Sequence, residues 1–148
     1  VPAAVYDRLR ALFEYRLAAA RSAPTAAAFE KELANFGFWF VSGKFDECWS
    51  LDTLLSVLEL TGKIEFERDV TKHLAELCPR FPLECVTALR RMIDGSKETW
   101  IVLALGDEAK QLLGAALHSG NPHAAFAARR LAEDLIAKCH FDFRKLLE

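Results

Sequence analysis

The chain has 148 residues, of which 52% are hydrophobic and 27% charged, and its formal net charge is −2 at pH 7. These figures are those of an ordinary globular domain, and they exclude a disordered or collagen-like chain. A net charge so close to zero provides no overall positive field to attract nucleic acid or anionic lipid. The 23 Ala and 22 Leu residues, set against 17 Val, Ile and Thr residues, favour helix over strand. We therefore expect an almost all-helical protein.

Apolar residues recur every three or four positions along most of the chain, which predicts amphipathic helices joined by short links. We expect helices over about 2–21, 29–37, 46–61, 70–77, 82–95, 107–120, 122–138 and 141–147. Their start signals are Pro2, Asp46 or Ser50, Pro82, Asp107, and Asn121 followed by Pro122. The positions expected to carry the apolar face of the last long helix are Phe126, Leu131, Leu135 and Ile136. Two short apolar segments remain: 38–45 is expected to be a buried turn or short helix, and 96–106 a short helix or loop.

The length fits a single all-helical domain over 1–148 with a core large enough to need no disulfide or metal. The cysteines Cys48, Cys78, Cys85 and Cys139 form no CxxC pair, so we expect small buried thiols in a reducing compartment. No signal peptide or membrane span is visible, which predicts a cytoplasmic location. Because the chain starts at Val1 instead of Met, we also expect it to be a piece of a longer protein.

Three predicted helices end in the same way, with apolar positions leading to Gly62, Gly95 and Gly120. After the first and the last of these glycines, the following helix reaches a Leu-Ala-Glu tripeptide, at 74–76 and 131–133. Repetition of helical hairpins with an irregular period predicts stacked antiparallel helix pairs, an α-solenoid. An irregular helical bundle is the alternative, because helix, glycine and helix also follow one another in antiparallel bundles.

The segments 36–46 and 117–125 resemble the HEAT-like α-helical repeat regions found toward the C-terminus of large bacterial proteins. In the second segment, a helix ends in a small residue and Gly120, and Asn121-Pro122 starts its partner helix. The resemblance covers about 36–148. It implies a non-catalytic scaffold that binds another protein or another part of its own chain, and it transfers no catalytic residue.

The sequence contains no motif that predicts an enzyme or a cofactor site. The GxSxG, HExxH, GxxxxGK[ST] and GxGxxG motifs are all absent. Nitrogen and sulfur ligands concentrate only at His118, His123, Cys139 and His140, and the helix between the two pairs would separate them by roughly 24 Å. We therefore expect no catalytic residue, no cofactor and no metal site.

Two features could mark a partner-binding surface. The first is a basic strip, in which the pairs Arg90-Arg91 and Arg129-Arg130 would contact an acidic protein segment or, as an alternative, a phosphate backbone. The second is a cluster of six aromatic residues within 36–49, among which Trp39 and Trp49 would contact a partner if they were exposed. Each feature also has a purely structural explanation. The arginines of the strip can lie on ordinary solvated helix faces, and the aromatic cluster can be part of the packed core.

Together these observations predict a protein-protein interaction or scaffolding module of helical repeats. One alternative is a helical repeat domain that associates with nucleic acid through its Arg-containing faces, although the net charge makes nucleic acid an unfavoured partner. A second alternative is a regulatory helical bundle with a small-molecule pocket. The identity of the partner and the oligomeric state are not encoded in any motif.

Overall fold

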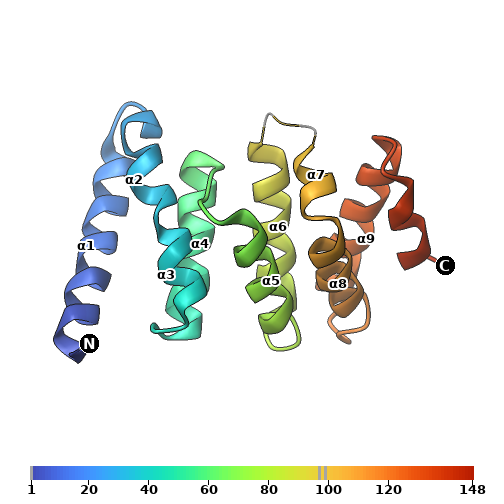
Figure 1. Cartoon of the computed structure of the whole chain (residues 1–148), viewed down its shortest axis with the longest axis horizontal. Coiled ribbons are helices and arrows are strands. Elements are labelled where there is room, and N and C mark those ends of the chain that lie inside the picture. The colour runs from blue at the N-terminus through green and yellow to red at the C-terminus, as the bar shows by residue number, and fades with distance from the viewer. Residues whose placement is uncertain (1, 97, 99) are drawn as a thin grey trace. The chain divides into compact units, whose positions relative to one another are not determined.

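The structure is a computed structural model that describes residues 2–96, 98 and 100–148. Over these residues the chain forms nine α-helices and two 3-10 helices and no strand (Figure 1), so the all-α prediction is confirmed. The helices are α1 (Ala3–Ser22), η1 (Ala26–Phe29), α2 (Glu30–Ala34), α3 (Phe36–Ser42), α4 (Glu47–Thr61), α5 (Glu67–Leu77), α6 (Pro82–Gly95), α7 (Ile101–Ala104), α8 (Gly106–Leu117), α9 (Pro122–Ala137) and η2 (Phe141–Leu146).

The chain divides into two compact units, Val1–Phe66 and Glu67–Glu148. The first unit holds α1 to α4 with η1, and the second holds α5 to α9 with η2. Each unit has a buried apolar core of its own. The prediction of one domain over 1–148 stays a prediction.

In the first unit, α1 packs against α2 and α4, and α3 packs against α4. The core combines aromatic and aliphatic side chains that are almost fully buried: Phe13, Leu17, Leu33, Phe36, Phe40, Leu51, Leu54 and Val57. The rings of Phe13 and Phe36 meet edge to face with their centroids 5.0 Å apart. Aromatic packing between α1 and α3 therefore anchors the first helix to the unit.

Gly37 allows the segment that follows α4 to lie directly on α3. The Glu65 amide donates a hydrogen bond to the Ala34 carbonyl at 2.9 Å. A Cβ on Gly37 would lie 2.0 Å from the Glu65 carbonyl oxygen, far closer than atoms can approach. The sequence pattern predicts this glycine at the end of a helix over 29–37, and that prediction is wrong. The helix ends at Ala34, and Gly37 lies inside the next one.

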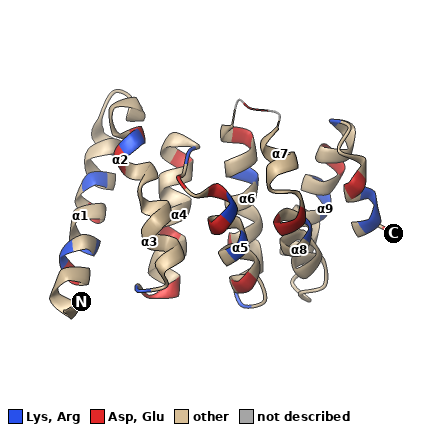
Figure 2. Ribbon diagram, in the orientation of Figure 1, with Lys and Arg blue, Asp and Glu red and all other residues tan. Residues whose placement is uncertain are grey.

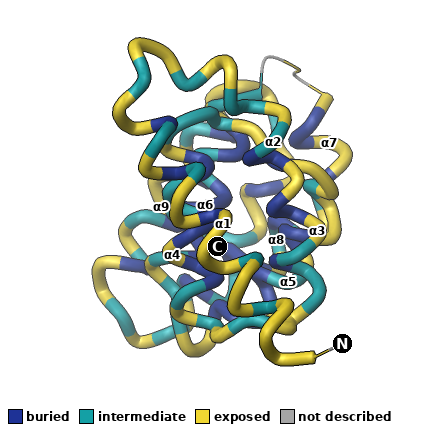
Figure 3. The backbone as a smooth tube through the Cα atoms, turned by 90° about the vertical axis from the view of Figure 1, so that its left-hand side faces the viewer, coloured by how far each residue is buried: buried dark blue, intermediate teal, exposed yellow. Residues whose placement is uncertain are grey.

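In the second unit, α8 packs against α5, α6 and α9, while α6 also packs against α9. The 3-10 helix η2 lies against α9 and α8 and buries Phe143. Every long helix of the unit contributes further buried side chains, among them Val70, Leu74, Val86, Leu89, Leu112, Leu113, Leu131 and Leu135. Buried and exposed positions alternate along the helices (Figure 3), as expected for amphipathic helices.

Several predicted helix ends are confirmed by the capping contacts. The Asp46 carboxylate accepts a hydrogen bond from the Trp49 amide at 3.0 Å, and the Asn121 side chain accepts from the His123 and Ala124 amides. Gly62 directly follows the end of α4 and has a left-handed backbone conformation, with φ of 67°.

Other predicted helix ends are wrong. Asp107 does not cap α8, because the helix already begins at Gly106 and Asp107 lies in its first turn. The predicted helix over 141–147 is a 3-10 helix, and α8 ends at Leu117 before Gly120 is reached. The segment 96–106 contains the short helix α7, while Lys97 and Thr99 within it lie outside the described residues.

The cysteines are free thiols, and only half of them match the expectation of burial. Cys78 and Cys85 are buried, whereas Cys48 and Cys139 are exposed. Burial raises the pKa of the Cys78 thiol to about 11, and that of Cys85 is also raised by burial. In the part of the chain that the structure describes, no helix is long and apolar enough to cross a membrane.

Candidate functional site

The two arginine pairs of the predicted basic strip differ in their contacts with acidic residues of the chain. Arg90 on α6 donates a hydrogen bond to Asp134 on α9, with 2.7 Å between Nη2 and Oδ2. That contact holds the pKa of the Asp134 carboxyl below its ordinary value. Arg91 is half-buried on the same helix. Of the two arginines on α6, Arg90 therefore contacts its own unit, and the Asp134 carboxylate on α9 neutralises its charge.

Arg129 and Arg130 lie exposed on α9. Neither side chain forms a hydrogen bond or an ion pair with any of the described residues. Adjacent residues of a helix point about 100° apart, so the two guanidinium groups flank the exposed face of α9 instead of pointing the same way. Arg130 also helps to lower the pKa of the Asp134 carboxyl through space. Of the predicted strip, Arg129 and Arg130 are thus the exposed cations that no described carboxylate pairs with directly.

Phe126 extends this face with a large apolar side chain that is 67% exposed. It precedes Arg129 by three residues and Arg130 by four, so the three side chains are neighbours on one side of α9. The prediction that Phe126 belongs to the apolar packing face of this helix is wrong. The buried residues of α9 are Ala124, Ala128, Leu131, Ala132 and Leu135, and Phe126 lies between the first two.

A hollow of about 300 Å³ lies beside this face, between α8, α9 and η2. Its lining residues are Leu117, His118, Ala125, Phe126, Arg129, Leu146, Leu147 and Glu148. Most of these side chains are apolar, and Arg129 contributes a cation. The sequence carried one usable signal for this surface, because Phe126 falls out of register with the other apolar residues of its helix.

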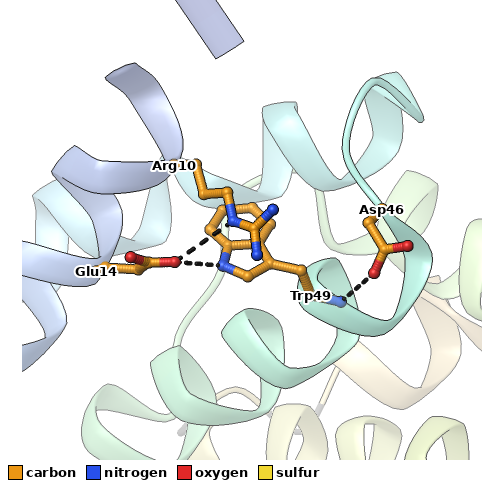
Figure 4. Close-up of polar contacts among 4 residues, drawn as sticks. All are labelled: Arg10, Glu14, Asp46 and Trp49. Atoms are coloured by element: carbon orange, nitrogen blue, oxygen red, sulfur yellow. Dashed lines mark hydrogen bonds and ion pairs between the residues drawn. The ribbon is translucent and has the colours of Figure 1, made fainter. Parts of the chain in front are cut away.

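Trp49 is half-buried and contacts other residues of the first unit (Figure 4). Its indole Nε1 donates a hydrogen bond to Glu14 at 3.0 Å, and the Arg10 guanidinium lies 5.2 Å from the centre of its ring. Arg10 Nε also lies 3.4 Å from the same Glu14 oxygen. The indole thus joins α4 to α1, and its contact with a partner stays a prediction.

Trp39 lies at a second, smaller hollow in the first unit. This hollow measures about 190 Å³ and is lined by Leu9, Leu12, Phe13, Arg16, Glu32, Leu33, Asn35 and Trp39. Trp39 is half-buried, and its ring meets the exposed Phe38 ring edge to face at 5.1 Å. The Arg16 guanidinium is ion-paired to Glu32, so the cation of this hollow is already neutralised.

The aromatic cluster at 36–49 is therefore part core and part surface. Phe36 and Phe40 are buried, Phe38 is exposed, and the remaining rings are half-buried. In the same unit α1 carries several Arg residues, visible as blue bands in Figure 2. The cluster contributes to the core of the first unit and leaves the Phe38 ring exposed.

A third hollow, of about 290 Å³, lies in the second unit near α7, α8 and η2. Its lining includes two ion pairs, one between Arg68 and Glu108 at 2.9 Å and one between Lys110 and Asp142 at 3.2 Å. His140 also lines it, whereas His118 lines the hollow beside α9. No group of three or more His, Cys, Asp or Glu side chains placed to hold a metal ion is found among the described residues.

Comparisons of this chain with models of protein families, with curated proteins and with solved structures find no match.

Proposed function

We propose that this chain is a non-catalytic protein-protein interaction module, and that an acidic segment of another protein or of another domain binds to the exposed face of α9. The observation that carries the proposal is the combination of Phe126 with Arg129 and Arg130, since an exposed aromatic ring and two arginines without ion pairs occupy one helix face. Aromatic residues and Arg are the residue types enriched at the centres of protein interfaces.

We also propose that the helices are arranged as stacked antiparallel pairs in the HEAT-like manner. Short links join α5 to α6 and α8 to α9, which favours antiparallel neighbours. Packing of α8 against α5 and of α9 against α6 supports a stack of these two pairs.

The test is capture of binding proteins from a cell lysate by the wild-type chain and by a charge-reversed variant, Arg129→Glu with Arg130→Glu. A matched control reverses two exposed cations of the first unit whose side chains form no ion pair with a described residue, Arg8→Glu with Lys44→Glu. We expect a protein that the wild type and the control retain, and that the α9 variant binds at least about tenfold more weakly.

Nuclease treatment and a salt series distinguish a protein partner from the nucleic-acid alternative. Binding to phosphate backbones weakens steeply between about 50 and 200 mM salt, and it disappears with the nucleic acid. Equal retention by the α9 variant, or loss of all binding on nuclease treatment, would contradict the proposed function.

A further inference from the structure

The hollow between α8, α9 and η2 has the size and lining of a receptor for one side chain. Its volume of about 300 Å³ lies at the small end of the range for ligand sites in proteins. The Leu117, Leu146 and Leu147 side chains contribute to its lining and are only partly buried, so a bound apolar group would remove their exposed surface from water. Ala125 opens the hollow on the α9 side, because its side chain is a single methyl group.

The charged groups at the hollow favour an anion near this apolar lining. Arg129 lines the hollow and is not ion-paired, and Arg130 adds a second cation on the same helix. Glu148 is the one acidic residue among the described residues that line the hollow. The His118 Nδ1 donates a hydrogen bond to the Gly114 carbonyl at 2.9 Å, and this bond holds the imidazole ring against α8. The surface is thus complementary to a carboxylate placed beside an apolar group.

The spacing on α9 sets the distance between these two groups in the ligand. Arg129 follows Ala125 by four residues, so the two side chains start from neighbouring positions on one side of α9, and both line the hollow. A partner segment with an aromatic side chain and a Glu or Asp a few residues away would contact both at once. Such a pairing of a buried anchor with charged neighbours is common in peptide recognition.

We infer that this hollow seats one large apolar side chain of an acidic segment, whose carboxylates pair with Arg129 and Arg130. The inference rests on the proposed function and adds to it the anchor residue and its receptor. It predicts that binding depends on the apolar side chain as well as on charge, whereas a purely electrostatic contact would depend on charge alone.

Two synthetic peptides test the inference on the wild-type chain. The first is acetyl-Glu-Glu-Ala-Phe-Ala-Glu-Glu-amide, and the second has Ala in place of its Phe. In a titration followed by ¹H-¹⁵N NMR, we expect the Phe peptide to shift the amides of Ala125, Phe126 and Leu147. We expect the Ala peptide to bind about tenfold or more weakly. Equal affinity of the two peptides would overturn the inference.

Two variants separate the hollow from the charges. Ala125→Trp fills the hollow and keeps both arginines, and Ala137→Trp, at an exposed position of α9 that does not line the hollow, is its matched control. We expect Ala125→Trp to abolish the preference for the Phe peptide, and Ala137→Trp to keep it. If Ala125→Trp still preferred the Phe peptide to the Ala peptide, the hollow would not be the receptor for the apolar side chain. The proposed function would be unaffected by that result.

The double charge reversal at Arg129 and Arg130 tests the proposed function with the same peptides. We expect it to weaken both peptides at least about tenfold, because both carry the same carboxylates. Unchanged affinity in this variant would contradict the proposed function itself. Because the comparison of the two peptides is made on the wild-type chain, the inference stays testable even if a variant does not fold.

Discussion

Cys139 holds a backbone conformation that favours glycine. Its φ is 72°, and its amide donates to the Ile136 carbonyl at 2.9 Å while the His140 amide donates to the Leu135 carbonyl at 3.0 Å. These bonds close the end of α9 in the manner of a C-terminal capping motif, in which glycine is the usual residue. For other residues the left-handed conformation costs roughly 1–2 kcal/mol.

Cys139→Gly should therefore raise the free energy of unfolding by about 1 kcal/mol, since the side chain is exposed and loses little packing. The midpoint of urea unfolding measures the change. Cys139→Ser is the control, because it removes the thiol and leaves the Cβ in place. If the serine variant were stabilised as much as the glycine variant, backbone strain would not be the cause.

Gly37 illustrates a constraint that acts through space. Gly37→Ala would place a methyl group 2.0 Å from the Glu65 carbonyl oxygen, so α3 and the segment after α4 would have to separate. We expect a loss of about 2 kcal/mol or more in the free energy of unfolding, as for other forced overpacking of a core.

Gly114→Ala is the matched control, measured by the same urea titration. At Gly114 a new methyl group would meet the Leu146 Cδ2 atom at an ordinary 3.7 Å. Because glycine inside a helix is unfavourable, this variant should be neutral or up to about 1 kcal/mol more stable than the wild type. Equal effects of the two substitutions would rule out the close approach at Gly37 as the cause.

Among the elements, α6 and α9 are joined by the ion pair between Arg90 and Asp134. Hydrogen bonding from Arg90 lowers the pKa of the Asp134 carboxyl, so the folded state favours the ionised form. The resulting stabilisation is present above the ordinary pKa of an aspartate, about 3.9, and is lost as the pH falls through the lower pKa of the folded state.

Arg90→Met removes the guanidinium and keeps much of the side-chain length. We expect this variant to be less stable than the wild type at pH 7, and the difference to shrink as the pH falls toward 3. NMR titration should show the pKa of Asp134 rising toward its ordinary value. Arg129→Met, which removes a cation that forms no ion pair, should leave that pKa unchanged. A difference in stability that is independent of pH would contradict this account.

The helices were predictable where their signals are local. Asp46 and Asn121 cap helices because a short polar side chain reaches amides two or three residues ahead, and the sequence alone shows that spacing. Asp107 has the right residue type, but the short α7 leads directly into α8 at Gly106, so the cap position falls on Leu105. Where the neighbouring elements decide the position at which a helix begins or ends, the residues of that helix alone do not predict it.

The candidate site was predictable only in part, for the same reason. Arg129 and Arg130 could be named from the sequence as a charged pair, but the sequence does not show that Asp134 neutralises Arg90. Phe126 could have been assigned to the surface, since it lies two residues from both Ala124 and Ala128 in the buried stripe. The hollow itself depends on η2 folding back on α8 and α9, a contact between distant segments.

At the scale of the whole molecule, the two compact units carry separate spectroscopic and chemical probes. Trp39 and Trp49 belong to the first unit, and the buried thiols of Cys78 and Cys85 belong to the second. Trp100 in the second unit is exposed and can be replaced by Phe, and Cys48 and Cys139 can be replaced by Ser. In that variant, tryptophan fluorescence reports on the first unit and thiol labelling on the second.

We expect both probes to give the same urea midpoint, since chains shorter than about 150 residues usually unfold in a single cooperative transition. In the native state, labelling of Cys78 and Cys85 should be slow, because burial raises the pKa of both thiols and hides them from the reagent. Two separated midpoints would overturn the single-domain prediction over 1–148.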